Sequence, residues 1–447
     1  MKKLSFSLYT FIILLGFFIS LLFTYSYIDF SSNMSVGVGH VYTAKSLALS
    51  GNFNVDEYWG NSGVDVVTAF DGHKYVAYAP LNAVLMAIPY YGLQVFYFFY
   101  SKLVGPINGD ISIILESLAF SLPSSIFYAL TGFLLFRFLR ESGIKKMIAI
   151  LTVIGLLFGT IFLNYSVSFF NHVPAAFFIF YSFYLISKQK TDKAFLFAGI
   201  LTGFAFLTEF PAILFSIGVG FFLLYELKYE KLSADVFIRR LIYFATPVAF
   251  SIFLLGLYNY VHFGSPFLMA EQILYQQKLA LGAGVEHNFS QNPAYGIWGL
   301  YFSPLKGLFL ISPFLLFSFF GFRNYLKQNK KPAILGLSYI IFVSLLYSLW
   351  PDCFGATPFG PRYLISVIPF LAFYSAFALT GKIRIWIYTI FVVFGIFICL
   401  MNVLDGLPSG KWFGQNCQVM EFGSYRKAFD YFEKFEAPNQ RFAPILL

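Results

Sequence analysis

The feature that most constrains this chain is the recurrence of long apolar stretches along its 447 residues. Hydrophobic residues make up 58% of the sequence and charged residues 11%, whereas soluble domains carry about 45–50% and about 25%. An apolar stretch of roughly twenty residues can cross the hydrocarbon core of a bilayer as a helix, and its backbone polar groups then pair within the helix. The sequence therefore predicts an all-α polytopic membrane protein.

The apolar stretches predict about eleven transmembrane helices. The first follows Lys2 and Lys3 and lacks a clear cleavage site after it, so we interpret it as a transmembrane helix and not as a cleaved signal. The expected spans are approximately 6–28, 111–136, 147–165, 172–187, 194–209, 211–227, 241–261, 305–322, 332–350, 363–380 and 384–404.

One further apolar stretch, 81–100, decides the topology. It is rich in Tyr and is interrupted by Pro89 and Gly92. If it crossed the membrane, every later basic connector would be external, against the positive-inside rule. If it lies at the outer interface, which Tyr favours, six short cytoplasmic connectors hold 19 of the 30 Lys and Arg residues. These connectors are 1–3, 137–146, 188–193, 228–240, 323–331 and 382–384. We therefore predict an interfacial helix at 81–100.

This topology predicts one transmembrane domain, residues 1–404, and a small external tail, 405–447. The external loops are 29–110, 262–304 and 351–362, with a cytoplasmic N-terminus and the working face outside the plasma membrane. The formal charge of +9 is accounted for by the cytoplasmic connectors, so we predict no nucleic-acid partner. Cys353 and Cys417 are both expected outside the membrane. The sequence leaves open whether they form a disulfide or stay as two separate thiols.

The first external loop carries the densest group of polar residues. Asp65 and Asp71 are the candidates for a general base, because a carboxylate can accept a proton from a sugar hydroxyl. Asp65 could also hold a divalent cation against phosphate, although the sequence requires no cofactor. The alternatives are that Asp71 with Gly72 forms a turn and that Asp65 caps a helix or is solvated.

Other polar residues predicted outside are candidates for substrate binding. In the first loop these are His40, His73, Lys74 and Tyr75. Cations at the start of later spans could bind a lipid phosphate, Arg362 through two parallel hydrogen bonds and Lys306 as a point charge. The remaining candidates, Asp352 and Tyr363, flank Arg362 in the same segment. Each of these cations could equally anchor its helix at the interface.

Taken together, several motifs resemble the GT-C superfamily of integral-membrane glycosyltransferases, in particular the prokaryotic dolichyl-phosphate-mannose-protein mannosyltransferase-like group. The motifs span nearly the whole chain. They are 42–53, 65–80, Asn171-His172, Leu207-Thr-Glu-Phe-Pro211, His262-Phe-Gly-Ser-Pro266, Ser303-Pro-Leu-Lys-Gly-Leu308 and Phe359-Gly-Pro-Arg-Tyr363.

The resemblance implies an inverting transfer of a sugar, a hexose such as mannose or a pentose, from a polyprenyl-phosphate donor to a glycan, lipid or protein acceptor at the membrane. An acidic residue of the first loop would deprotonate the acceptor, and later cations would hold the lipid phosphate. Family members commonly carry an acid near the position of Val38-Gly39-His40, and this chain has none there. We therefore expect Asp65 to act as the base, with Asp29 and Asp56 as alternatives. The Ala79-Pro80-Leu81 segment also lacks the basic residue and glycine common in relatives.

Two other functions fit the same features. A flippase of lipid-linked glycans would share the phosphate-binding cations but needs paired broken helices or internal repeats, which the sequence does not offer beyond the break at Glu209-Phe-Pro211. A catalytically silent scaffold with the same fold would explain the absent acid near Gly39.

Overall fold

The computed structural model describes residues 2–24, 35–59, 65–189, 191–280, 289, 291–304, 306–350 and 359–405. Helices dominate these residues. The first half contains α1 (Lys2–Thr24), α3 (Ser35–Ser50), β1 (Val66–Thr68), β2 (Lys74–Val76), α4 (Leu81–Leu103), α5 (Gly109–Glu141), α6 (Lys146–Phe158), α7 (Phe162–Ser166), α8 (His172–Lys188), α9 (Asp192–Thr208), η2 (Phe210–Leu214) and α10 (Phe215–Tyr229). The second half contains α11 (Ala234–Phe263), α12 (Ala270–Ala280), α13 (Pro293–Phe302), α14 (Leu308–Ile311), η3 (Pro313–Leu316), α15 (Phe317–Gln328), α16 (Lys330–Ser348), η4 (Arg362–Leu364), α17 (Ile368–Ser375), η5 (Ala376–Ala378) and α18 (Lys382–Asp405).

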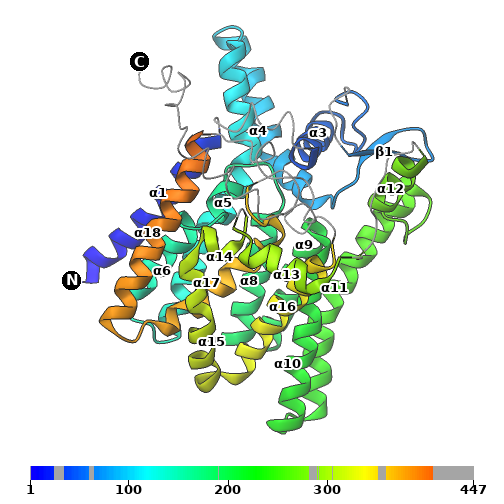
Figure 1. Ribbon diagram of the computed structural model, residues 1–447. Helices are drawn as coiled ribbons and strands as arrows, with labels where there is room; N and C mark the ends of the chain where they lie inside the picture. Colours follow the sequence, from blue (N-terminus) through cyan, green and yellow to red (C-terminus); the bar gives the residue numbers. More distant parts are fainter. Residues whose placement is uncertain are drawn as a thin grey trace.

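The helices form a bundle with two distinct ends. Figure 1 shows the α10–α11 and α15–α16 turns at one end and α3, β1 and α12 at the other. We call these the connector end and the hairpin end. The short β1 and β2 pair antiparallel, with Val66 opposite Val76 and Thr68 opposite Lys74, so the otherwise helical fold carries one small hairpin outside the bundle.

Ion pairs join the basic connectors to one another. Glu226 at the end of α10 contacts Arg240 of α11 at 2.8 Å and Lys331 of α16 at 2.7 Å. Asp192 at the start of α9 contacts Arg239 at 2.6 Å. Residues of three connectors that the charge pattern assigned to the same side, 188–193, 228–240 and 323–331, are therefore close together at one end of the bundle.

The structure confirms a mostly helical chain with several helices long and apolar enough to cross a membrane. Among the described residues six helices satisfy this criterion: Leu81–Leu103, Gly109–Glu141, Phe210–Tyr229, Ala234–Phe263, Lys330–Ser348 and Lys382–Val403. Shorter apolar helices cover Thr10–Leu22, Lys146–Phe158 and Ile368–Ala378. Several expected spans are broken by short 3₁₀ segments, such as Pro313–Leu316, so the count of about eleven spans stays a prediction.

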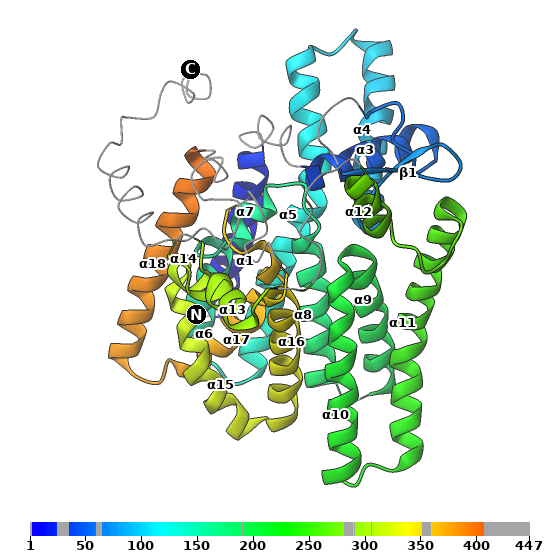
Figure 2. The same ribbon diagram turned by 45° about the vertical axis from the view of Figure 1, so that its right-hand side comes forward.

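Helix α4 covers the stretch that decided the topology. It packs against α3 and α5, and Figures 1 and 2 show α4 and the start of α5 side by side, rising beyond the bundle at the hairpin end. Few of its residues are buried, among them Asn82, Met86 and Tyr90. The helix thus lies apart from the bundle, while its position on the membrane surface stays a prediction.

Close packing of α9 against α11 depends on small residues. A Cβ on Gly199 would lie 2.3 Å from the carbonyl oxygen of Phe244, and one on Gly203 would lie 2.2 Å from the Ser251 hydroxyl. Glycine at both positions lets the two backbones approach, as is common between membrane helices. This contact aligns the hairpin ends of the two helices, where the candidate site lies.

Candidate functional site

The β hairpin carries several of the residues predicted from the sequence. Asp71 accepts hydrogen bonds from the His73 backbone N–H at 2.9 Å and from the Tyr75 hydroxyl at 2.8 Å, and Gly72 takes a positive φ of 82°. Partial burial works to raise the pKa of Asp71, but these hydrogen bonds and the nearby His73 outweigh it and lower the pKa. The geometry therefore accounts for Asp71 as part of a turn.

Asp56 ties the hairpin to the preceding loop. Its carboxylate contacts His73 Nδ1 at 2.6 Å and accepts from the Lys74 backbone N–H at 2.8 Å. The hydrogen bond to Asp56 is the main reason that the pKa of His73 is raised. The Lys74 ammonium lies 3.8 Å from the centroid of the Trp59 ring, a cation–π contact. His73 and Lys74 thus both make contacts within the loop.

Asp65 stands at the start of the hairpin and is oriented by a tyrosine. Its Oδ2 accepts from the Tyr78 hydroxyl at 2.6 Å. The charge of Asp65 also acts on Glu271 of α12. Surrounding protein atoms and repulsion from Asp65 raise the pKa of Glu271 to about 7. By surface area the residue is nevertheless exposed. Asp65 is therefore a half-buried carboxylate with a fixed orientation and an acidic neighbour.

His40 lies beside this tyrosine, in the segment where the resemblance led us to expect an acid. The ring centroids of His40 and Tyr78 are 5.6 Å apart, and the His40 side chain is 2% exposed. Burial, together with the nearby His172, lowers the pKa of His40 to about 3. A neutral imidazole whose Nε2 has no hydrogen-bond partner therefore replaces the expected carboxylate.

A second group of side chains surrounds Arg362 at the hairpin ends of α8, α9 and α16. His172 Nδ1 lies 3.2 Å from Glu209 Oε2, close enough for an ion pair though not aligned as a hydrogen bond. The Tyr347 hydroxyl donates to Glu209 Oε1 at 3.2 Å. The Tyr347 ring stacks on Tyr363, with centroids 4.3 Å apart and planes 5° from parallel.

Two aromatic rings flank the Arg362 guanidinium. Its central carbon lies 5.2 Å from the Tyr363 centroid and 5.5 Å from the Phe170 centroid. Phe170 in turn stacks on His172, with centroids 5.9 Å apart and planes 14° from parallel. Arg362 and Tyr363, predicted as substrate-binding residues, are thus brought together on a packed aromatic surface.

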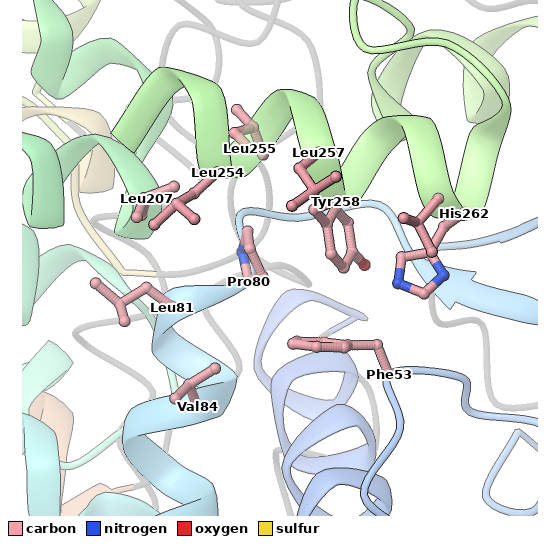
Figure 3. A pocket seen from close by; sticks show the side chains of 11 residues that line it. Phe53, Pro80, Leu81, Val84, Leu207, Leu254, Leu255, Leu257, Tyr258 and His262 are labelled. Atoms are coloured by element: carbon pink, nitrogen blue, oxygen red, sulfur yellow. The ribbon is translucent and has the colours of Figure 1, made fainter. Parts of the chain in front are cut away.

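An apolar groove of about 320 Å³ lies between α11 and the start of α4 (Figure 3). One wall comes from α11, through Leu254, Leu257 and Tyr258, and the other from Pro80 and from the start of α4. The full lining is Phe53, Pro80, Leu81, Val84, Leu207, Leu254, Leu255, Leu257, Tyr258, Val261 and His262. The volume falls in the range of small-molecule sites, and the lining suits a hydrocarbon chain.

The chain order links the groove to both polar groups. Leu207 lines the groove two residues before Glu209, and Pro80 lines it two residues after Tyr78. Each polar group is therefore close in the chain to one residue that lines the groove.

The remaining predicted residues have different environments. Tyr75 is buried and packs on His262 at 4.4 Å, so it supports the hairpin. Lys306 is 3% exposed, which does not fit the alternative of an anchor reaching water.

Asp352, Cys353, Cys417 and Asp29 lie outside the described residues. Among the residues that the structure does describe, no three His, Cys, Asp or Glu side chains are grouped to hold a metal ion.

No candidate role was predicted from the sequence for some of these residues. His172 and Glu209 appeared only in motifs, although an ionisable pair near the end of apolar stretches is itself a signal of function. Tyr347 and Phe170 had no signal, because two aromatic residues among 61 Phe and 31 Tyr are not distinctive. Their importance follows only from the packing.

Comparison with known proteins supports a glycosyltransferase fold. Residues 113–258 match the family model of dolichyl-phosphate-mannose-protein mannosyltransferases. No curated protein sequence matches the chain.

Solved structures match over nearly the whole chain. The apo oligosaccharyltransferase of Archaeoglobus fulgidus superposes with a TM-score of 0.52 and 13% identity, covering 96% of this chain and 61% of that one. Apo ArnT of Cupriavidus metallidurans gives a TM-score of 0.50 and 13% identity, covering 90% and 63%. A second ArnT structure, bound to undecaprenyl phosphate, gives 0.47 and 14%, with 90% and 63% covered.

The chain therefore spans about three fifths of the length of these structures. At this level of identity the likeness concerns the fold. Together with the family match, it confirms the resemblance to GT-C glycosyltransferases that the sequence motifs indicated.

Proposed function

We propose that this chain, whose fold resembles that of the GT-C glycosyltransferases, transfers a sugar from a polyprenyl-phosphate donor on the outer face of the plasma membrane. The sugar would be a hexose such as mannose, or a pentose, and the acceptor a glycan, a lipid or a protein. The family match and the similar fold support the reaction class.

The observation that carries the proposal is the presence of both an apolar groove and a half-buried Arg362. A polyprenyl phosphate has a hydrocarbon chain and an anionic head, so its site needs an apolar channel and a cation nearby. The groove supplies the first, and the half-buried Arg362 supplies the second. Leu207 at the hairpin end of α9 lines the groove, and Glu209 after it is linked to Arg362 through Tyr347 and Tyr363. A guanidinium binds phosphate oxygens through paired, charge-assisted hydrogen bonds.

In the proposed reaction Asp65 accepts the proton of the acceptor hydroxyl. The hydroxyl oxygen forms a bond to the anomeric carbon, while the bond between that carbon and the phosphate oxygen breaks. The departing polyprenyl phosphate keeps the electron pair, and Arg362 stabilises its negative charge. The hydrogen bond from Tyr78 to Asp65 Oδ2 orients the carboxylate that would accept the proton.

The contacts of the nearby Asp56 argue against it as the base. Both Asp56 oxygens already have partners in His73 and Lys74. The same reasoning assigns Asp71, His73, Lys74 and Tyr75 to the support of the acceptor side of the site. We assign Lys306 and Asp352 to the donor side, where Lys306 adds positive charge, and the buried His40 to the packing beside Tyr78.

The test uses the purified full-length protein in liposomes with a radiolabelled polyprenyl-phosphate sugar and membrane-extracted acceptors. Asp65→Asn should reduce transfer by roughly 10²- to 10⁴-fold, the usual contribution of a general base. Arg362→Ala should weaken binding of the donor. Glu226→Gln, at the opposite end of the bundle, is the control and should keep both. Movement of the lipid across the bilayer without sugar transfer would contradict the proposal and favour a flippase.

A further inference from the structure

We infer that Glu209 is a positioning residue that holds Arg362 ready for phosphate, an inference that rests on the function proposed above. Glu209 is not among the residues expected to touch substrate. Its role follows from a closed ring of contacts that begins and ends at Arg362.

The ring consists of six side chains in consecutive contact. Arg362 lies against Phe170, which stacks on His172, which pairs with Glu209. Glu209 accepts from Tyr347, which stacks on Tyr363, and Tyr363 lies against Arg362. The two aromatic walls of the guanidinium, Phe170 and Tyr363, are therefore linked to each other through the carboxylate of Glu209.

Each carboxylate oxygen of Glu209 contacts a residue that packs on a different one of the two rings. Oε2 lies 3.2 Å from His172 on the Phe170 side, and Oε1 accepts from Tyr347 at 3.2 Å on the Tyr363 side. These partners come from the start of α8 and the end of α16, whereas Glu209 directly follows α9. One carboxylate thereby fixes three helix ends around Arg362.

Burial separates the supporting part of the ring from the part that can meet a ligand. Phe170, His172, Glu209 and Tyr347 are all less than 10% exposed, while Arg362 and Tyr363 are half-buried. A carboxylate is costly to bury without partners; Glu209 has a hydrogen bond from Tyr347 and lies within ion-pair distance of His172. The ring therefore presents only its Arg362–Tyr363 edge outward.

This arrangement lowers the entropic cost of binding an anion. A free arginine side chain carries about 2 kcal/mol of rotamer entropy that is lost when it binds. Two fixed rings restrict the guanidinium plane before any phosphate arrives, and cation–π contacts hold it there. Preorganisation of this kind is expressed as tighter ground-state binding of the phosphate group.

The test measures binding of undecaprenyl phosphate, the lipid present in one ArnT structure, to the purified full-length protein in detergent. Glu209→Gln keeps the size and an acceptor for Tyr347 but removes the charge facing His172. It should weaken binding roughly tenfold, equal to about 1.4 kcal/mol, and raise the donor KM by a similar factor with a smaller change in kcat.

Two further variants separate positioning from folding. Glu226→Gln removes a charge from another buried glutamate, which pairs with Arg240 and Lys331 at the connector end. It should lower Tm at least as much as Glu209→Gln and leave the lipid affinity within about twofold of wild type. In an Arg362→Ala background, Glu209→Gln should cause no further loss of affinity, because its effect acts through Arg362.

The outcomes distinguish the two proposals. If Arg362→Ala weakens binding but Glu209→Gln does not, the positioning role is wrong and the donor site stands. If Glu209→Gln weakens binding equally with and without Arg362, it acts on the fold alone and the inference is overturned. If the wild-type protein does not bind undecaprenyl phosphate, or Arg362→Ala binds it normally, the proposed donor site itself fails.

Discussion

The ring of Tyr347 lies flat on the ring of Tyr363, with centroids 4.3 Å apart and planes only 5° from parallel. Tyr347 is attached to the end of α16, and Tyr363 belongs to the short η4 segment that carries Arg362. The stack therefore fixes the arginine segment to the bundle by surface contact, without a hydrogen bond between the two rings.

This contact predicts different effects for two substitutions of Tyr363. Tyr363→Phe keeps the stack and should leave the donor KM within about threefold of wild type. Tyr363→Leu removes the stack, which is worth about 0.5–1.5 kcal/mol, and should raise the donor KM by roughly two- to tenfold. Initial rates at varied donor concentration measure both. Equal KM values for the two variants would mean that the stack has no part in holding Arg362.

The pKa of Glu271 predicts a dependence of stability on pH. Burial and the charge of Asp65 raise this pKa from 4.5 to about 7, so the folded state favours the protonated acid. Stability from this group is greatest below pH 4.5, falls as the pH rises from 4.5 to 7, and is constant above that range. Glu271→Gln cannot ionise, so its Tm should exceed that of wild type by a margin that grows up to pH 7.

Thermal unfolding in detergent at intervals between pH 5 and pH 8 measures this margin. Asp65→Asn provides the control, because it removes one cause of the raised pKa and should move the end of the fall to a pH below 7. A margin between Glu271→Gln and wild type that does not change with pH would show that Glu271 does not titrate in this range.

The hairpin contacts predict that Asp71 supports structure and not chemistry. Asp71→Asn weakens the bonds from the His73 backbone N–H and the Tyr75 hydroxyl, at about 1 kcal/mol of local stability each. Limited proteolysis within the hairpin should therefore become faster, while sugar transfer stays within about threefold of wild type. Asp65→Asn should give the opposite pattern, with an intact hairpin and lost transfer. Loss of transfer in Asp71→Asn with unchanged proteolysis would assign Asp71 to catalysis.

The sequence predicted the general architecture because apolar length and basic connectors obey simple rules. Lys331 and Arg240 were assigned to the same side by charge counting alone, and the structure joins both to Glu226. The hairpin turn at Asp71-Gly72 was also foreseen as one of two alternatives, since that dipeptide favours turns.

The surroundings of Arg362 could not be predicted in the same way. Phe170, Glu209 and Tyr347 are separated by many residues and meet only through the packing of α8, α9 and α16. No local pattern marks one aromatic residue as a contact of an arginine, because aromatic residues are common throughout this chain. The replacement of the expected acid by His40 was visible in the sequence, but its burial beside Tyr78 was not.

The contact between α9 and α11 predicts how the apolar groove responds to a small substitution. A Cβ at Gly199 would meet the backbone oxygen of Phe244 at 2.3 Å, and a backbone atom cannot rotate away. Gly199→Ala should therefore push the helices apart at a cost of about 1–3 kcal/mol, and disturb the groove walls that Leu207 and Leu254 provide.

Gly220 of α10 is the matched control, because a Cβ there would have no atom within 4 Å. Gly220→Ala should keep or slightly raise Tm, since alanine favours the helix by up to about 1 kcal/mol. Gly199→Ala should lower Tm by several degrees and weaken the binding of undecaprenyl phosphate more than that of a short-chain prenyl phosphate, which needs less of the groove. An equal loss for both lipids would place the hydrocarbon chain outside this groove, on a different face of the bundle.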